Sequence, residues 1–323
     1  MKYGIGLYGN NQHQVHAQLV GNSRVRLCGI CEFDKNLLDP SLCKANALVE
    51  YKSLEDMLGN GDIGIISLCS PMRSEQAKQA IMCMEKGKHV LAEKPCAFSE
   101  EEIDELLETS KRTGMVFREM AGAGLSQPVL GIGKVIDSGI LGNIVQVFCQ
   151  KSYPMHERRP NDEMIDGGII MQCALHAIRY IEHGSRLRIN NVKYAIETQY
   201  CNQLVGGDLK TACSIICTLE NGGIATIIAN YWNPLKGFGK WGNEHMRVFG
   251  ENGFAEFTDS GERTRVVLND KDMGAYDAFE DKKPYFEYFI DEVQGVGGPP
   301  MKIQDEIHAT RIAIRAKKIA ELY

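Results

Sequence analysis

The stretch IGIISLCSPMRSEQAKQAIMCMEKGKHVLAEKPC, residues 63–96, carries two apolar runs separated by one helical pattern. The runs IGIISLC (63–69) and HVLAE (89–93) have the composition of buried strands. Between them, residues 75–86 follow a helical pattern that Gly87 ends. A strand, a helix and a second strand in this order predict a parallel sheet with helices on both faces.

The same alternation continues from residue 2 to residue 118, where further strand-like runs are separated by helical patterns. A short helix is expected over Ser53–Leu58, and a longer helix begins at the capping box of Ser99 and Glu102 and closes at Gly114. We therefore predict a doubly wound Rossmann domain over residues 1–120. The further strand candidates are YGIGLY (3–8), RVRLCGI (24–30), ALVEY (47–51) and MVFRE (115–119).

The pattern changes after residue 120, where one helix near Ser126–Ser138 precedes strands that follow each other directly. Asn221 and Gly222 stand between two β-rich runs, which is typical of a hairpin, and residues 250–253 repeat the pattern. Residues 121–323 are thus predicted to form a second, α+β domain with a mostly antiparallel sheet. The chain ends in an amphipathic helix.

The composition fits this two-domain prediction, because 323 residues exceed the usual size of one domain. The net charge of -6, from 42 acidic and 36 basic residues, provides no basic surface for nucleic acid or an anionic membrane. No apolar run approaches the ~20 residues of a membrane span.

Six of the eleven cysteines lie in apolar runs, which predicts buried thiols and a cytoplasmic location; they are Cys28, Cys31, Cys69, Cys83, Cys213 and Cys217. Cys28 and Cys31 have CxxC spacing but no second pair, so no metal site is expected.

A dinucleotide-binding loop is expected after the first strand, in the stretch GLYGNNQHQVH (6–16). Gly9 occupies the first glycine position of the Rossmann fingerprint, whereas Asn11 and Gln14 occupy the second and third. Asparagine tolerates left-handed backbone, which makes a turn at Asn10 and Asn11 feasible. A plain turn between strand and helix is the alternative.

The second strand ends at Glu32, 23 residues after Gly9, near the position of the acid that binds the ribose 2′-hydroxyl. This carboxylate favours NAD. A 2′-phosphate at ~4 Å from it would be repelled by about 4 kcal/mol at an effective dielectric constant of ~20. The nearby Lys35 would tolerate a 2′-phosphate, so NADP is the less favoured cofactor. The other alternative is that Glu32 faces solvent and binds no ribose.

Residues 61–108 resemble the Gfo/Idh/MocA oxidoreductases, the glucose-fructose oxidoreductase and inositol dehydrogenase superfamily. The resemblance lies in the proline-containing turn after the fourth strand, the segment GKHVLAEKP (87–95) and the acidic helix that follows. SGILGNIVQV (138–147) resembles the segment that crosses between the family's domains. The resemblance implies an N-terminal Rossmann domain and a C-terminal domain with an open, mostly antiparallel sheet, through which the family forms homodimers or homotetramers.

In this family the lysine of the Glu-Lys-Pro motif lies beside the nicotinamide and contacts the reacting hydroxyl, which implies a catalytic role for Lys94. Oxidation of an alcohol needs a base for the hydroxyl proton while hydride departs. A lysine pKa, ordinarily ~10.4, must fall close to neutrality for this task, which desolvation and a cationic neighbour favour. A surface lysine paired with Glu93 is the alternative.

The segment DGGIIMQCALHAIRYIEH (166–183) resembles the family's glycine-rich entry to a helix with an aspartate and, four residues later, a histidine. His176 matches the histidine, while Gln172 replaces the aspartate. Spacing of four residues predicts that both lie on one helical face. Glutamine cannot stabilise an imidazolium as a carboxylate does, so we expect Lys94 to be the principal proton-transfer group and His176 to assist. A packed histidine without function is the alternative.

A specificity loop is predicted over residues 150–163, where Lys151, Tyr153, Arg158 and Arg159 lie close together in sequence. Two arginines suit a carboxylate or phosphate, and pairing of both with nearby acids is the alternative. Residues 230–245, which contain both tryptophans, are expected to form a flap over the site or a subunit contact.

Together these features predict an NAD(H)-dependent oxidoreductase that acts on a secondary alcohol or ketone of a sugar, cyclitol or related polyol. A redox-neutral glycosidase that uses NAD and a non-enzymatic NAD-binding regulator are the alternatives. The expected cofactor contacts are Gly9, Asn10, Asn11, Gln12, His13, Glu32, Ser70, Pro71, Glu93 and Lys94. The expected substrate contacts are Lys94, Lys151, Tyr153, Arg158, Gln172 and His176.

Overall fold

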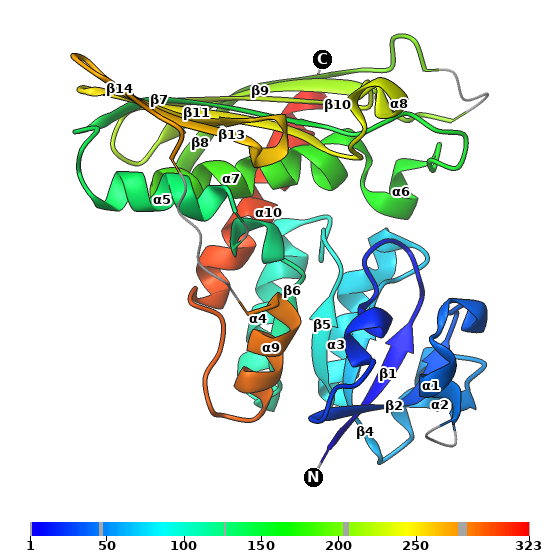
Figure 1. Ribbon diagram of the computed structural model, residues 1–323. Coiled ribbons are helices and arrows are strands. Elements are labelled where there is room, and N and C mark those ends of the chain that lie inside the picture. The colour runs from blue at the N-terminus through cyan, green and yellow to red at the C-terminus, as the bar shows by residue number, and fades with distance from the viewer. Residues whose placement is uncertain (1, 45–47, 126, 203–206, 277–282, 323) are drawn as a thin grey trace. The chain divides into compact units, whose positions relative to one another are not determined.

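The computed structural model describes residues 2–44, 48–125, 127–202, 207–276 and 283–322 (Figure 1). The chain divides into two compact units. The first comprises Met1–Met120, Met164–Asp166 and Lys283–Ile307, and the second comprises Ala121–Glu163, Gly167–Lys282 and His308–Tyr323.

The first unit is built on a six-stranded sheet with the order β3-β2-β1-β4-β5-β6. All neighbouring strands in it are parallel. The chain leaves β1 toward one edge of the sheet and later returns beside it as β4, so the strand order reverses between these two strands. This is the predicted doubly wound Rossmann sheet. Its strands are β1 Tyr3–Tyr8, β2 Val25–Cys31, β3 Val49–Glu50, β4 Ile63–Leu68, β5 His89–Ala92 and β6 Phe117–Glu119.

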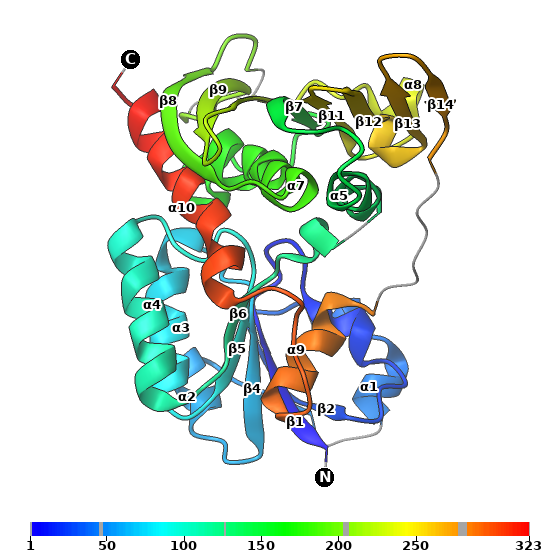
Figure 2. The same cartoon turned by 90° about the vertical axis from the view of Figure 1, so that its left-hand side faces the viewer.

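Helices cover both faces of this sheet, with α3 and α4 on one face and α1 and α9 on the other (Figure 2). Helix α4 has the predicted capping box of Ser99 and Glu102 and ends at Gly114, whose φ is 71°. The helical segments of this part are η1 Val15–Leu19, η2 Lys35–Leu37, α1 Pro40–Lys44, α2 Leu54–Leu58, η3 Arg73–Glu75, α3 Gln76–Glu85, α4 Glu100–Thr113 and α9 Tyr285–Val293.

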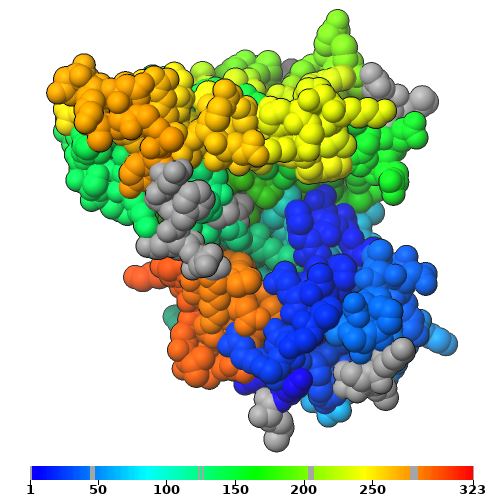
Figure 3. Space-filling view, viewed as in Figure 1, coloured from blue at the N-terminus to red at the C-terminus, as the bar shows by residue number. Residues whose placement is uncertain are grey.

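Helix α9 packs into the core of the first unit, although it lies far along the chain from the Rossmann strands. Phe286, Phe289 and Ile290 share a buried cluster with Ile5 and Leu7 of β1. Figure 3 shows the orange atoms of this part of the chain against the dark blue atoms of the N-terminal segment. The chain from Lys283 to Ile307 therefore belongs with the first unit, whereas the sequence pattern had placed it in the second domain.

The second unit contains an eight-stranded sheet with the order β14-β13-β12-β11-β7-β10-β9-β8. Only the pair β7 and β10 is parallel among the described strands of this sheet, so the prediction of a mostly antiparallel sheet is confirmed. The predicted hairpin joins β9 and β10, and Gly222 supplies its positive φ of 89°. The strands are β7 Ile144–Ser152, β8 Ile189–Thr198, β9 Ala212–Leu219, β10 Ile224–Asn230, β11 Asn243–Gly250, β12 Gly253–Thr258, β13 Arg263–Leu268 and β14 Asp272–Gly274.

Helices α5 and α7 lie against one face of this sheet (Figure 1). The helix predicted over Ser126–Ser138 begins at Val129, after Pro128; Ser126 lies outside the described residues. The remaining helical segments are η4 Gly122–Leu125, α5 Val129–Asp137, α6 Glu163–Asp166, the π-helix η5 Ile169–Ala174, α7 Leu175–Ser185, α8 Leu235–Phe238, η6 Asp259–Gly261 and α10 Ile303–Ala320.

All eleven cysteines are free thiols, and the six predicted to be buried are buried, including Cys28 and Cys31 on β2. Across the described ranges, no cluster of three or more His, Cys, Asp or Glu side chains is placed to hold a metal ion. The same ranges contain no helix whose length and apolar character would let it cross a membrane.

Candidate functional site

The carboxyl ends of β1 and β4 hold the predicted nucleotide-binding loop. Gly9 adopts a left-handed conformation with a φ of 69°, and a Cβ atom placed on it would lie 2.0 Å from the carbonyl oxygen of Cys69. Only glycine fits this close approach of the two loops. The second left-handed residue is Gln12, with a φ of 84°, so the left-handed conformation falls on Gln12 and not on Asn10 or Asn11.

Gln14, which replaces the third glycine of the fingerprint, is buried and ties the loop together. Its amide nitrogen donates to the carbonyl oxygens of Gly9 at 2.9 Å and Ser67 at 3.2 Å. Its amide oxygen accepts from the backbone N–H of Val15 at 2.9 Å. The side chain therefore fixes the path of the loop from within.

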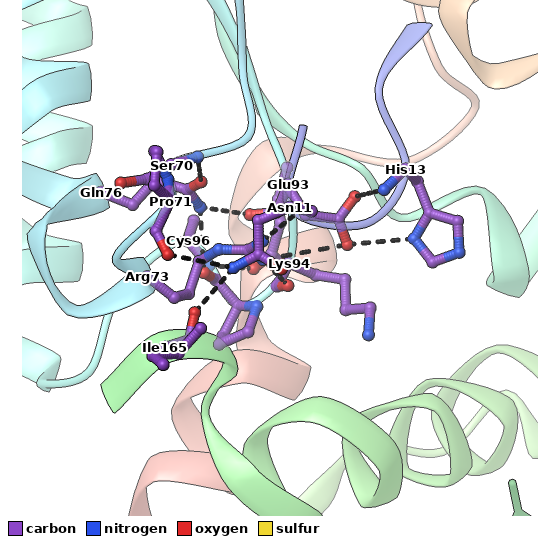
Figure 4. Close-up of polar contacts among 12 residues, drawn as sticks. Asn11, His13, Ser70, Pro71, Arg73, Gln76, Glu93, Lys94, Cys96 and Ile165 are labelled. Atoms are coloured by element: carbon purple, nitrogen blue, oxygen red, sulfur yellow. Dashed lines mark hydrogen bonds and ion pairs between the residues drawn. The ribbon is translucent and has the colours of Figure 1, made fainter. Parts of the chain in front are cut away.

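Arg73 connects the three loops that follow β1, β4 and β5 (Figure 4). It is fully buried, and its guanidinium donates to the carbonyl oxygens of Asn11, at 2.8 Å, and Lys94. The same group lies 3.9 Å from the carboxylate of Glu93. Asn11 in turn donates from its side chain to the carbonyl oxygen of Ile165 at 2.7 Å.

Glu93 is fully buried at the end of β5, and its carboxylate is ionised. It accepts a hydrogen bond from the backbone N–H of His13 at 3.3 Å and pairs with the His13 ring at 3.2 Å. Burial opposes the charge, but His13, Arg73 and Lys94 outweigh burial and lower the pKa of Glu93 to about 2. The end of β5 thus carries a permanent negative charge at neutral pH.

Lys94 is only 1% exposed, so it is not the surface lysine of the alternative interpretation. The backbone around it is fixed by three buried side chains. Arg73 holds the Lys94 carbonyl, Gln76 donates to the Glu93 and Pro95 carbonyls, and Glu119 accepts from the Cys96 N–H at 2.6 Å. The Lys94–Pro95 peptide bond is cis. The turn that carries Lys94 is therefore held by side chains from outside the motif.

The other predicted cofactor residues surround this turn in the first unit. Ser70 is buried and donates from its hydroxyl to the Met72 carbonyl at 2.7 Å, whereas Pro71 is exposed. Glu32 is exposed at the end of β2 with a φ of 51°. The structure thus brings the carboxyl ends of β1, β2, β4 and β5 to one edge of the sheet, where Asn10, Gln12 and His13 are exposed.

The second unit places Gln172 and His176 differently from the prediction. Gln172 lies in a π-helix and His176 lies in the α-helix that follows, so spacing of four residues does not describe a single α-helical face. Both side chains are buried. The Gln172 amide oxygen accepts from the hydroxyl of Tyr231 at 3.5 Å, and the His176 ring meets the Tyr153 ring edge-on at 6.1 Å.

The segment predicted to be a specificity loop, residues 150–163, places its two arginines differently. Arg158 is exposed, whereas Arg159 is buried and stacks on the Tyr231 ring at 3.7 Å. Lys151 pairs with Glu244 and lies 4.6 Å from the centre of the Tyr153 ring. The loop is therefore more ordered by internal contacts than the alternative of a solvated charged loop implies.

Arg73, Gln76 and Glu119, the three residues that hold the Lys94 turn, were not predicted from the sequence. Arg73 and Gln76 follow β4 by a few residues, and Glu119 ends β6 beside β5. The sequence marks these three residues only by their position, because polar residues at the carboxyl ends of adjacent parallel strands meet at one edge of the sheet.

A parallel Rossmann sheet with a glycine-dependent loop at its switch point defines the class of the first unit as a dinucleotide-binding domain. Residues 3–120 match the family described as "Oxidoreductase family, NAD-binding Rossmann fold", and residues 129–256 match the "GFO/IDH/MocA C-terminal domain". The chain belongs to the Gfo/Idh/MocA family of oxidoreductases.

Three relatives show how the chain compares with characterised and solved proteins. It is 21% identical to the myo-inositol 2-dehydrogenase of Thermotoga maritima over 285 residues, which cover 84% of this chain and 81% of the relative. It is 28% identical to a glycosyl hydrolase family 109 protein of Shewanella woodyi over 147 residues, which cover 43% of this chain and 30% of that relative. Its fold matches levoglucosan dehydrogenase in complex with NADH and levoglucosan with a TM-score of 0.80, at 15% identity and with coverage of 100% and 98%.

Proposed function

We propose that this protein is an NAD(H)-dependent dehydrogenase or reductase that acts on a secondary alcohol or ketone of a sugar, cyclitol or related polyol. The observation that carries the proposal is the buried Lys94 in a fixed turn at the carboxyl end of β5. The family and the similarity to an inositol dehydrogenase support the substrate class.

The edge of the Rossmann sheet fits a dinucleotide. At Gly9 a Cβ atom would collide with the Cys69 carbonyl, so the backbones of the two loops lie close together, as at the first glycine of a dinucleotide-binding loop. Gly9, Asn10, Asn11, Gln12 and His13 would hold the diphosphate side, with Ser70 and Pro71 opposite, and Glu32 would bind the ribose. When bound, the nicotinamide accepts or supplies hydride.

Lys94 is the acid and base of the proposed reaction. In the oxidative direction its amine takes the hydroxyl proton while the same carbon gives up hydride and the C–O bond becomes a carbonyl. In the reductive direction the ammonium returns that proton. The Lys94 ammonium is one of the groups that lower the pKa of Glu93, so the ionised Glu93 favours the protonated lysine, which is the proton donor of the reductive direction. The assisting role of His176 and the substrate contacts of the second unit stay predictions.

Replacement of Lys94 by alanine tests this assignment. General acid–base catalysis typically contributes about 10²–10⁴-fold, so we expect Lys94→Ala to lower kcat/KM by roughly 10³-fold. The Kd for NAD should change by less than a few-fold, since Arg73 holds the turn through the Lys94 backbone carbonyl, which alanine keeps.

Lys88 provides a matched control, because it is a buried lysine at the opposite end of β5 whose ammonium donates to the Ile63 carbonyl at 2.7 Å. Lys88→Met should lower stability but leave kcat/KM of the folded enzyme nearly unchanged. Turnover of the Lys94→Ala enzyme within a few-fold of the unaltered enzyme would discard the assignment.

The preference for NAD over NADP is proposed from Glu32. Its carboxylate is exposed, and Lys35 is engaged in an ion pair with Glu50, so the end of β2 presents negative charge. NAD should raise the melting temperature more than NADP at equal concentration. Glu32→Ala should narrow this difference, whereas equal protection of the unaltered protein by both nucleotides would refute the preference.

A redox-neutral glycosidase is a second candidate, because the chain resembles a glycosyl hydrolase family 109 protein over 147 residues. Transient oxidation by the same site would then lead to glycosidic cleavage. Release of the chromophore from nitrophenyl glycosides without accumulation of NADH would favour this function over the dehydrogenase.

A further inference from the structure

Arg73 is a buried charge whose hydrogen bonds do not require a charge. Its side chain is fully buried, and its guanidinium donates to the carbonyl oxygens of Asn11, at 2.8 Å, and Lys94. Gln76 makes a comparable pair of contacts with a neutral amide, which donates to two carbonyl oxygens of the same turn. Burial of a charge costs desolvation free energy that a neutral side chain avoids. The positive charge of Arg73 therefore needs a reason beyond these two hydrogen bonds.

The guanidinium of Arg73 lies beside Glu93 but is not positioned by it. It is 3.9 Å from a carboxylate oxygen of Glu93, which is beyond hydrogen-bond distance. The same oxygen lies 3.2 Å from Nδ1 of His13 on its other side (Figure 4). The two carbonyl contacts thus hold the guanidinium in place, and Arg73 acts on Glu93 through its charge alone.

His13 and Arg73 both stabilise the Glu93 carboxylate, but their charges differ in permanence. The His13 side chain is 65% exposed, so solvent screens its charge, and a histidine ring can lose that charge near neutral pH. Arg73 is buried, and an arginine stays protonated throughout the pH range in which enzymes work. Arg73 is therefore the permanent positive charge beside Glu93.

The charge of Arg73 also acts on the protonation of Lys94. Glu93 directly precedes Lys94 and interacts with its ammonium, which favours the protonated lysine. A permanent positive charge close to Glu93 offsets this effect and favours the neutral amine, which is the base of the oxidative direction. Because Lys94 is only 1% exposed, water screens these interactions little.

The other titratable groups near Glu93 do not supply this positive charge. Burial raises the pKa of the Cys69 thiol well above its ordinary value, so the thiol, which interacts with Glu93 and Arg73, stays uncharged at neutral pH. Glu119, at the end of β6, accepts from the N–H of Cys96 at 2.6 Å, and a negative charge there adds to that of Glu93. Both groups leave the compensation of Glu93 to its cationic neighbours.

We propose that Arg73 is a positioning residue that keeps Lys94 able to accept a proton, because its permanent charge offsets that of Glu93. The inference rests on the proposed function for the role of Lys94, and it adds a residue that sets the pH range in which Lys94 is the base. The reaction is unchanged: the Lys94 amine takes the hydroxyl proton while hydride leaves the same carbon for the nicotinamide.

The protonation of Lys94 can be followed by NMR without any reaction. The full chain is labelled with ¹³C-lysine, and the Cε signal of Lys94, identified by its absence from Lys94→Ala, is titrated from about pH 6 to about pH 11. We expect Arg73→Gln to raise the midpoint by about one pH unit, the effect of one charge removed from within roughly 10 Å at an effective dielectric constant of ~20. An unmoved midpoint in a folded Arg73→Gln protein would overturn the proposal.

Two controls separate charge from structure. Lys88 is an internal control in the same spectra, because it is a buried lysine at the opposite end of β5, and its midpoint should not move. Arg73→Lys keeps the charge but loses the planar fork of the guanidinium, so the Lys94 midpoint should stay within a few tenths of a pH unit. A midpoint raised as much by Arg73→Lys as by Arg73→Gln would contradict the proposal.

Glu93→Gln tests the same interaction with the opposite sign, and it decides the question if Arg73→Gln does not fold. Removal of the negative charge should lower the Lys94 midpoint by about one pH unit. A midpoint that does not fall would show that Glu93 does not act on Lys94, and the compensating role of Arg73 would fall with it.

Kinetics distinguish failure of this inference from failure of the proposed function. At saturating NAD, the pH at which kcat/KM for polyol oxidation reaches half of its plateau should rise in Arg73→Gln by the same amount as the NMR midpoint. A raised midpoint in a protein that transfers no hydride to any polyol would reject the dehydrogenase and keep the effect of Arg73. Hydride transfer with an unmoved midpoint would reject the role of Arg73 alone.

Discussion

Glu93 combines complete burial with a negative charge at neutral pH, so we expect its loss to destabilise the first unit. Its pKa of about 2 lies below the ordinary value of 4.5 because His13, Arg73 and Lys94 stabilise the carboxylate more than burial destabilises it. A lowered pKa in the folded state means that the charge contributes stability above pH 4.5 and loses that contribution as the pH falls toward 2.

We therefore expect Glu93→Gln to lower the free energy of unfolding by roughly 2–3 kcal/mol at pH 7, a range that allows for the solvent exposure of His13. The difference between the two proteins should shrink as the pH falls below about 4.5. Urea unfolding of both proteins at about pH 7 and about pH 3.5 measures it. A difference that stays constant over this range would show that Glu93 is not held by its charge.

Lys94 could be singled out from sequence because it stands directly after a strand in a motif that resembles a family. The sequence does not reveal the three residues that hold its turn, Arg73, Gln76 and Glu119. They act through contacts with backbone atoms of a turn that is distant in sequence. Buried arginine and glutamine are uncommon, and the sequence around Arg73 has the pattern of an exposed helix start.

At the scale of single elements, the loop after β1 depends on Gly9 for two separate reasons. Its φ is left-handed, which costs other residues about 1–2 kcal/mol, and a Cβ atom there would collide with the Cys69 carbonyl. Gly21 has a similar φ of 70°, but a Cβ atom on Gly21 would have no neighbour within 4 Å.

Gly9→Ala should therefore destabilise the protein by roughly 2 kcal/mol more than Gly21→Ala and should also weaken NAD binding. Denaturant midpoints of the two variants, with and without NAD, provide the comparison. Equal midpoints would mean that the loops after β1 and β4 do not approach as closely as described.

Helix α4 could be predicted almost to the residue, because the Ser99–Glu102 capping box and Gly114 act within one turn of each end. The left-handed conformation of Gln12 could not be predicted from the sequence. It follows from the path of the loop toward β4 and not from the backbone preference of glutamine. The π-helix that contains Gln172 has no signature in hydrophobic periodicity either.

At the scale of the whole molecule, the C-terminal part of the chain returns to the Rossmann unit through a buried polar cluster. Glu306 accepts from the N–H of Glu119 at 3.0 Å and from the Tyr285 hydroxyl, and it pairs with Arg118 at 3.1 Å. Burial outweighs these contacts and raises the pKa of Glu306 to about 7. The segment that returns was not predictable, because the apolar stripe of α9 does not indicate which sheet it covers.

A carboxyl group whose pKa is raised by folding keeps its proton to a higher pH in the folded state than in the unfolded state. Stability should therefore fall as the pH rises from about 4.5 to about 7, by on the order of 3 kcal/mol from this group, and then level off. Glu306→Gln should flatten this part of the curve.

Urea unfolding at about pH 5 and about pH 7.5 measures the slope. Glu292→Gln is the control, because Glu292 is the other carboxylate paired with Arg118 and its loss leaves Glu306 in place. An unchanged slope in Glu306→Gln would assign the pH dependence to other groups.

The central claim is that Lys94 transfers the proton of a hydroxyl whose carbon exchanges hydride with a bound nicotinamide. A crystal structure of the protein soaked with NAD and a polyol substrate tests it most directly. We predict a nitrogen-to-oxygen distance of about 2.6–3.2 Å between the Lys94 ammonium and the reacting hydroxyl, with the nicotinamide beside the same carbon. A nicotinamide bound away from the end of β5, or a substrate hydroxyl held by another base, would contradict the claim.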